Sequence, residues 1–230
     1  MIFEVLDKGK IHLINTMGGD LSVVAAARVS NGLTYEEASK GEEKDQKLIN
    51  YLVKNRHGTP FEHSTFQFFI KAPLFVVREW QRHRMASYNE VSGRYVEFEP
   101  EFYIPTKWRI PGDTNKQGSK VPTLDEQPQQ WHVNRYQDTL RLFNEAYVTY
   151  TSMLKMGVAK EMARMVLPLG TYTQFYWTVN ARSLMNFLSL RAAPDAQWEI
   201  QQYAYSIERM FCTSMPLTYR AWKDNGRVAP

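Results

Sequence analysis

The densest group of chemically active side chains is the segment from Arg82 to Arg94. It reads Arg-His-Arg-Met-Ala-Ser-Tyr-Asn-Glu-Val-Ser-Gly-Arg. Its arginines offer planar hydrogen-bonding forks for phosphate, its Ser-Gly step lets backbone amides approach a ligand, and Asn89 and Glu90 can bind a sugar or a base edge. A solvated helix end running into a turn is the alternative interpretation. The turn-forming residues between apolar segments favour a nucleotide site over that alternative.

A second polar group runs from Asn180 to Arg191. Arg182 and Asn186 are four residues apart, so both lie on one face of a helix. Arg191 falls instead in register with the apolar stripe of the same helix. A guanidinium on that stripe needs a partner, because burying an unpaired charge is costly. Arg191 is therefore either paired with a carboxylate or available to an anionic ligand.

Other familiar chemistries lack support in the sequence. There is no Gly-x-Gly-x-x-Gly after a strand, no phosphate-binding Gly-Lys-Ser/Thr loop, and no histidine pair at the spacing of a zinc helix. We therefore predict no metal site. The single cysteine, Cys212, excludes an internal disulfide and suits a reducing compartment. It lies outside both polar groups, so we expect it to pack rather than to act as an activated nucleophile.

Composition and charge indicate an ordinary globular chain. Of 230 residues, 43% are hydrophobic and 23% charged, and we favour a single domain over 1–230. The formal net charge of +4 is too small to predict nucleic-acid binding, although it suits small anionic ligands. The most apolar stretch, 66–77, is interrupted well short of the roughly 20 apolar residues that span a bilayer. Acids stand where a signal peptide carries cations, so we expect a cytoplasmic protein without a membrane partner.

Apolar periodicity and turn residues predict the elements that position these groups. Strands are predicted at 2–6, 11–14, 65–71, 94–98 and 171–179. Helices are predicted at 42–55, from 73 to about 86, and at 131–156, with further helices capped by Asp20, Asn180 and Asp195. The proline-rich segment 99–130 is predicted to be a surface excursion. This order favours an α+β fold with a largely antiparallel sheet packed against long helices.

The segment from Arg82 to Arg94 matches the pattern Arg-His-Arg-x-x-Ser-x-Asn-x-x-Ser-x-Arg in full, and in this it resembles the flavin-dependent thymidylate synthases. Four other segments are similar to sequences of that family: 27–30, 59–63, 167–169 and 177–188. The resemblance implies reductive methylation of dUMP to dTMP. The carbon donor would be 5,10-methylenetetrahydrofolate, which leaves as tetrahydrofolate, and the hydride donor would be FADH2, regenerated by NADPH. It also implies a homotetramer with active sites between subunits and no nucleic-acid partner.

The same resemblance implies roles for individual residues. Those expected to hold FAD are Thr59, Arg82, His83, Arg84, Glu90, Asn180, Arg182 and Asn186, with Ser30 and His57 near the flavin. Those expected to bind dUMP are Glu79, Arg82, Glu90, Val91, Ser92, Gly93, Arg94, Arg164 and Arg191. Arg191 is the predicted catalytic residue, because a fixed guanidinium beside the uracil would stabilise the negative charge that develops when N3 ionises. Ser92 is assigned to substrate binding, since a hydroxyl without a neighbouring base is a weak nucleophile.

Two other interpretations compete with this one. A nucleic-acid-binding protein could use the turn at 82–94 as a phosphate clamp, which predicts binding that weakens steeply with salt and no bound chromophore. A flavin-binding relative that has lost methyl transfer would keep the arginines at 82 and 84 but be indifferent to dUMP.

Overall fold

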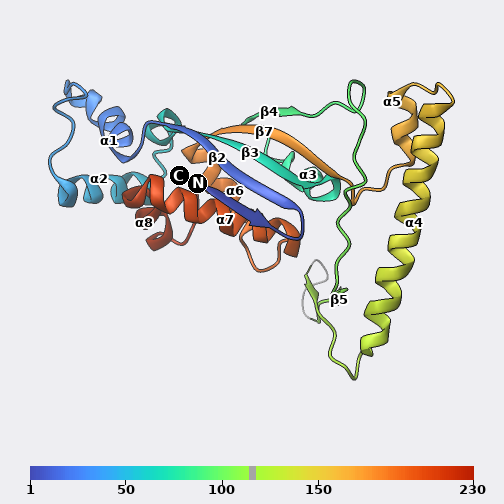
Figure 1. Ribbon diagram of the computed structural model, residues 1–230. Helices are drawn as coiled ribbons and strands as arrows, with labels where there is room; N and C mark the ends of the chain where they lie inside the picture. The colour runs from blue at the N-terminus through green and yellow to red at the C-terminus, as the bar shows by residue number, and fades with distance from the viewer. Residues whose placement is uncertain (114–117) are drawn as a thin grey trace.

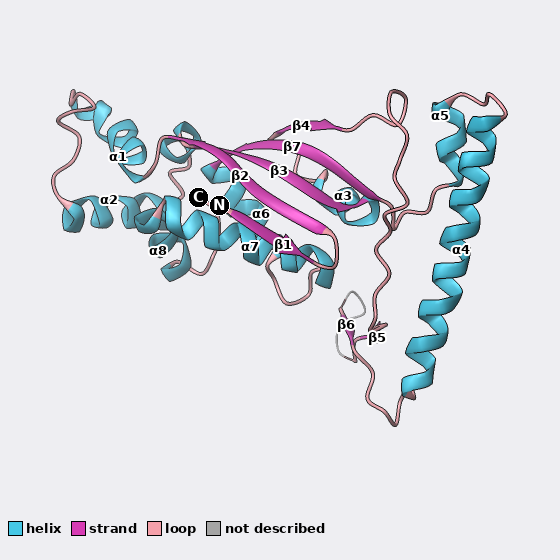
Figure 2. Ribbon diagram, in the orientation of Figure 1, coloured by secondary structure: helices cyan, strands magenta, loops and turns pink. Residues whose placement is uncertain are grey.

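The computed structural model of the protein describes residues 1–113 and 118–230 and is built around a five-stranded sheet. In spatial order the strands are β1 (Ile2–Val5), β2 (Gly9–Met17), β3 (Thr65–Pro73), β7 (Tyr172–Asn180) and β4 (Ser87–Glu90). Every neighbouring pair is antiparallel. Helices lie beneath one face of this sheet (Figures 1 and 2), which confirms the predicted α+β class.

The helices follow the chain in a simple order. They are α1 (Asp20–Arg28), α2 (Glu42–Lys54), α3 (Leu74–Trp80), α4 (Gln129–Lys155), α5 (Lys160–Ala163), α6 (Ala181–Arg191), α7 (Trp198–Ser214) and α8 (Pro216–Asp224). Short 3-10 turns are η1 (Val29–Asn31), η2 (Thr59–His63) and η3 (Arg164–Val166). No helix in the described ranges is both long and apolar enough to cross a bilayer.

Alternating side chains give the sheet one buried face. Phe68 of β3 and Trp177 of β7 are paired in register, fully buried, and stacked with ring centroids 5.5 Å apart. Trp80, at the end of α3, packs against the same face. Its ring centroid lies 5.3 Å from that of Trp177 and 5.0 Å from that of Phe187 in α6. Such aromatic contacts add to the stabilisation from burial. They fix the end of α3 against Phe187 of α6 beneath the sheet.

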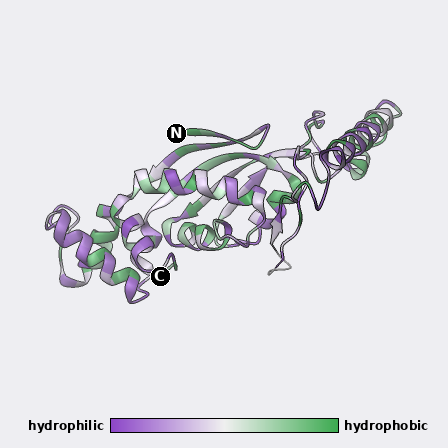
Figure 3. Cartoon of the chain, turned by 90° about the horizontal axis from the view of Figure 1, so that it is seen from below, coloured by the Kyte–Doolittle hydropathy of each residue, from purple (hydrophilic) through white to green (hydrophobic). Residues whose placement is uncertain are grey.

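The long predicted helix is confirmed as α4, but it lies apart from the body of the molecule (Figure 1). Of its side chains, His132 and Tyr150 are buried. Figure 3 shows that the projecting helix carries apolar as well as polar residues. The segment leading to it is tied to the body by Arg109, whose guanidinium pairs with buried Glu199 of α7 at 2.6 Å.

The predicted excursion at 99–130 contains more structure than its proline content suggested. Phe102 forms a bridge with Thr171, and a small hairpin joins β5 (Ile110–Pro111) to β6 (Ser119–Lys120). Helix α4 begins within it, at Gln129. Residues 114–117 of the excursion lie outside the described part of the chain.

Two element predictions around the arginine-rich segment were wrong. The helix predicted from 73 to about 86 ends at Trp80, because the chain turns there and Ser87–Glu90 then pairs with β7 as an edge strand. The strand predicted at 94–98 is a turn, in which the amides of Tyr95 and Val96 both donate to the carbonyl of Ser92. Alternating residues without a neighbouring strand to pair with do not form a strand.

Of the three predicted caps, only that of Asn180 is confirmed. Its side chain accepts a hydrogen bond of 2.8 Å from the Ser183 amide at the start of α6. Asp195 is exposed and does not cap α7, which begins three residues later, at Trp198. The prediction for Asp20 was wrong in a more informative way. Its carboxylate lies at the start of α8, where it accepts hydrogen bonds from the amides of Leu217 and Thr218, both at 2.9 Å.

Asp20 therefore connects the N-terminal part of the chain to the last helix. Replacing it with alanine should lower the free energy of unfolding by about 1–2 kcal/mol, since two amides and a buried hydroxyl lose their acceptor. Urea denaturation would measure the loss. The matched control is Asp195→Ala, for which we expect a change below about 0.5 kcal/mol because that side chain is exposed. Equal effects of the two substitutions would contradict the assignment.

Candidate active-site cleft

Residues 82–86 of the first polar group meet the second polar group in one cleft of about 1340 Å³ that runs along α6. Its lining residues are Glu62, Glu79, Arg82, His83, Arg84, Met85, Ala86, Val179, Asn180, Arg182, Ser183, Asn186, Leu190, Arg191, Ala229 and Pro230. One wall is a face of α6, and the other is the turn between α3 and β4. The packing of α3 against α6 is what brings segments about a hundred residues apart in sequence together.

Positive charge predominates in this cleft. It contains the arginines at 82, 84, 182 and 191 and the glutamates at 62 and 79, so four positive minus two negative charges leave +2. The N-terminus of α6 also lines it, and helix N-termini favour anions. The cleft is therefore suited to an extended anionic ligand.

Arg191 lies at the C-terminal end of α6, with 16% of its side chain exposed. Its Nη1 donates to Oε2 of Glu79 at 2.8 Å, its Nη2 donates to the Glu79 carbonyl at 3.1 Å, and its Nε donates to Nε2 of His83 at 3.0 Å. Of the two alternatives drawn from the sequence, pairing with a carboxylate is the one observed. The guanidinium nevertheless lines the cleft, where it can also reach a ligand.

His83 accepts the hydrogen bond from Arg191, and its surroundings determine both the pKa and the orientation of its imidazole. Burial, and then the positive charge of Arg191, lower the pKa of its imidazole to about 4. The ring packs edge-on against Phe187, with centroids 4.9 Å apart. His83 is therefore neutral near pH 7, with Nε2 unprotonated and able to accept.

Arg182 lies at the other end of the cleft and contacts two parts of the chain. Its Nη1 pairs with Glu62 of η2 at 2.6 Å, and its Nε donates to the Pro230 carbonyl at 2.8 Å. A side chain at Gly58 would overlap this guanidinium. His57 and Thr59 flank that glycine and are exposed, so the predicted flavin residues of this segment lie beside Arg182.

Other predicted site residues lie outside the cleft. Ser92, Gly93, Arg94 and Arg164 form a separate cluster beyond β4: Arg94 pairs with Glu161 at 3.0 Å, and a Cβ on Gly93 would lie 3.0 Å from the Arg164 side chain. The Val91 amide donates to Gln174 of β7. The Glu90 carboxylate accepts from Gln81 and Thr173, and the Ser30 hydroxyl donates to the Ala27 carbonyl.

Some residues of the cleft were not predicted as site residues. Glu62 belongs to segment 59–63, already noted as similar to the family, and this similarity was a signal that could have identified it as a site residue. Ala229 and Pro230 had no signal, because only the folded chain returns its last described residues to the start of α6.

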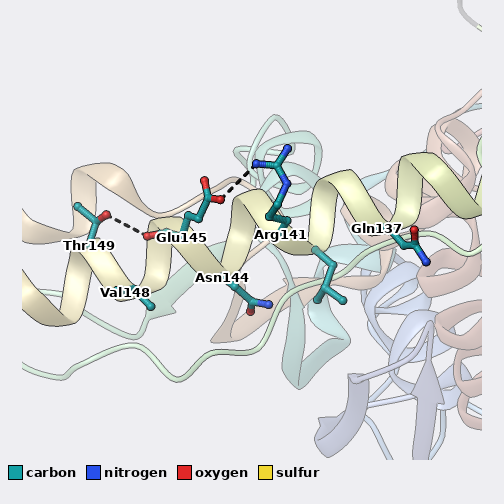
Figure 4. A pocket seen from close by; sticks show the side chains of 7 residues that line it. Gln137, Arg141, Asn144, Glu145, Val148 and Thr149 are labelled. Atoms are coloured by element: carbon teal, nitrogen blue, oxygen red, sulfur yellow. Dashed lines mark hydrogen bonds and ion pairs between the residues drawn. The ribbon is translucent and has the colours of Figure 1, made fainter.

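A second, open groove of about 640 Å³ lies along the exposed face of α4 (Figure 4). It is lined by Gln137, Leu140, Arg141, Asn144, Glu145, Val148 and Thr149. None of the predicted site residues is among them. Elsewhere in the described ranges, no three His, Cys, Asp or Glu side chains gather in a way that could hold a metal ion.

The sheet, α6 and the positively charged cleft define an α+β protein whose cleft is suited to an anionic ligand. The family model described as thymidylate synthase complementing protein matches residues 12–217. A flavin-dependent thymidylate synthase from Thermotoga neapolitana is 50% identical over 96% of this chain and 94% of its own length. The enzyme of the same name from Thermus thermophilus is 46% identical over 98% of this chain and 79% of its own.

Solved structures agree with these relatives. The UMP/dUMP methylase PolB from Streptomyces cacaoi, bound with 5-Br dUMP, superposes with a TM-score of 0.88 at 37% identity, covering 99% of this chain and all of the other. The chain belongs to the family of flavin-dependent thymidylate synthases.

The low pKa of His83 predicts a pH dependence of stability. The unfolded state has the ordinary histidine pKa of about 6.5, so between that pH and about 4 the folded protein binds fewer protons. This contribution to stability is fully present above pH 6.5 and is lost as the pH falls through that window. In urea unfolding measured from pH 7.5 to 4.5, His83→Gln should therefore lose less stability than the unsubstituted protein. His12→Gln, on the open face of the sheet, is the matched control; identical slopes for the His83 variant and the unsubstituted protein would contradict the assignment.

Proposed function

We propose that this protein is a flavin-dependent thymidylate synthase that methylates dUMP to dTMP. The carbon comes from 5,10-methylenetetrahydrofolate, the hydride from FADH2, and NADPH reduces the flavin. The observation that carries the proposal is the meeting of residues 82–86 with the second polar group in one cleft with a net charge of +2. Membership of the family and the relatives' names support it.

The residues of the cleft fit FAD in size and in charge. Its volume of about 1340 Å³ exceeds the 300–1,000 Å³ typical of small-ligand pockets, so the cleft has room for a dinucleotide. Its arginines can bind a pyrophosphate in the bidentate manner. The FAD-binding residues within the cleft are Arg82, His83, Arg84, Asn180, Arg182 and Asn186, with His57 and Thr59 beside it. When bound and reduced, the flavin supplies hydride chemistry that no amino-acid side chain provides.

Arg191 is the proposed catalytic residue. Its guanidinium is held in place by hydrogen bonds within the chain, so little reorganisation is needed when charge develops on a pyrimidine. Placed against the uracil ring, it would stabilise the anion formed when N3 loses its proton. Cys212 lies on α7, outside the cleft lining, which supports a mechanism without a cysteine nucleophile.

The cluster beyond β4 supports an active site shared between subunits. Arg94 and Arg164 are exposed cations near the Ser92-Gly93 turn and are suited to a nucleotide phosphate, yet they do not line their own chain's cleft. A neighbouring subunit of a homotetramer would supply them to it. The exposed apolar residues of α4, such as Leu142 and Val148, at 59% and 65% exposure, support contact with another copy.

The visible absorption spectrum of the purified protein tests this proposal. Added FAD should be taken up, and dUMP should then perturb the flavin bands, because both ligands share one site. Incubation with dUMP, methylenetetrahydrofolate and NADPH should yield dTMP. Failure to take up FAD, together with salt-sensitive binding of DNA, would favour the phosphate clamp; flavin bands indifferent to dUMP would favour a relative without methyl transfer.

Substitution of Arg191 tests the catalytic assignment. Arg191→Ala should lower dTMP formation by roughly a hundredfold or more, the scale seen when one preorganised donor to a developing anion is lost. FAD binding should be retained, since the other cleft arginines remain. Turnover and flavin content measured on the same preparation check this. Turnover equal to that of the unsubstituted enzyme would refute the role.

Mixing two inactive variants tests the shared site. Arg94→Ala should weaken dUMP binding more than FAD binding, and alone it should be poorly active. The two variants, Arg94→Ala and Arg191→Ala, are then dissociated, mixed at equal ratio and reassembled. The mixed oligomers should recover activity toward about a quarter of the unsubstituted level, because some sites then combine an intact Arg94 with an intact Arg191 from different subunits. No recovery in verified mixed oligomers would show that both residues act within one chain.

A further inference from the structure

Three hydrogen bonds from Arg191 end on only two residues, and both belong to the stretch around the end of α3. Glu79 accepts twice, through its carboxylate and its carbonyl, and His83 accepts through Nε2. Glu79 lies on the last turn of α3, and His83 follows the helix by three residues. We call these three acceptors the Arg191 cradle.

The cradle leaves Arg191 with a defined set of free donors. An arginine carries five N–H groups, of which the cradle takes one each from Nε, Nη1 and Nη2. Nη1 and Nη2 therefore each keep one N–H, for which the described residues supply no acceptor. Those two donors belong to a side chain that lines the cleft. Two adjacent acceptors on a flat ring would satisfy them.

His83 is suited to accept rather than to bind an anion. Neutral imidazole has one unprotonated nitrogen, and here Arg191 occupies it. The His83 ring packs against Phe187 on one side. The backbone carbonyl of His83 accepts a hydrogen bond of 2.8 Å from the Tyr88 hydroxyl. A protonated His83 would repel Arg191 and lose the bond, so its depressed pKa agrees with the contact.

We infer that His83 and Glu79 are positioning residues: they hold the Arg191 guanidinium in one orientation, so that its two remaining N–H groups face the pyrimidine of the nucleotide. This inference rests on the proposed function. It gives His83 a role toward the substrate ring, through Arg191, beyond the flavin contact that the resemblance implies. It also explains how an acid at position 79 fits beside a nucleotide: its charge is directed to Arg191.

Substitutions at His83 separate positioning from flavin binding. His83→Leu fills similar space but leaves Nε of Arg191 without its acceptor, and we expect kcat for dTMP formation to fall about 10- to 100-fold, the scale of a lost hydrogen bond to a charged group. His83→Gln places an oxygen where Nε2 lies and should restore most of that loss. KM for dUMP should change less than about threefold in both variants. Loss of the flavin contact also assigned to His83 would raise the Kd for FAD in both, so kcat is compared at saturating FAD, where only the loss of positioning separates His83→Leu from His83→Gln.

Crystal structures of both variants provide a readout that does not depend on turnover. The Arg191 side chain should move or become disordered in His83→Leu and keep its place in His83→Gln. Glu79→Leu should displace it as well, and Glu79→Gln should do so less. His12→Leu, on the open face of the sheet, is the control for replacing a histidine, and thermal unfolding confirms that each variant is folded.

The outcomes distinguish the inference from the function on which it rests. If the unsubstituted protein forms no dTMP, the proposed function fails, while the position of Arg191 in the variants still tests the cradle. If the unsubstituted protein is active and His83→Leu keeps both its kcat and the orientation of Arg191, the cradle is refuted and the proposed function stands. Loss of activity in His83→Gln equal to that in His83→Leu would also refute it.

Discussion

The burial of Trp80 is the constraint on which the site depends. Its indole is fully buried and contacts Phe175 and Trp177 of the sheet, Phe187 of α6 and Tyr203 of α7. Removing such a ring from a core typically costs 3–5 kcal/mol. Because Trp80 ends α3, its position also fixes Glu79 on one side and the turn bearing His83 on the other. The packing of one apolar residue thus determines where the polar ones lie.

Two glutamates hold two of the four cleft arginines in place but do not cancel the positive charge of the cleft. Glu79 engages Arg191 at one end, and Glu62 engages Arg182 at the other. Four arginines in a small volume would repel one another in the absence of ligand, and two acids reduce that repulsion while leaving the cleft positive. Each ion pair is partly exposed, so its stabilising effect is modest and its main consequence is orientation.

Two local patterns of this sequence held because a neighbour in the chain decided the outcome. Asn180 caps α6 because its acceptor and the Ser183 amide are three residues apart. The strand predicted at 65–71 is confirmed as β3, whose side chains are alternately half-buried and buried over most of its length because side chains in a strand have a period of two. The patterns failed where the partner was distant. Asp20 has the residue type of a cap, yet the helix start that it reaches is nearly two hundred residues away.

The sequence by itself determined the two polar groups, the antiparallel α+β class and the family. Each of these can be recognised from residue types in short segments and from the order of those segments along the chain. Tertiary structure decided which groups share a cleft. It placed Arg191 against His83 and Glu79 and left Arg94 and Arg164 in a separate cluster. That separation arises because β4 pairs with β7 and carries the chain away from the cleft before the Ser-Gly turn. Pairing between strands about ninety residues apart has no local signal, so only the folded chain could show it.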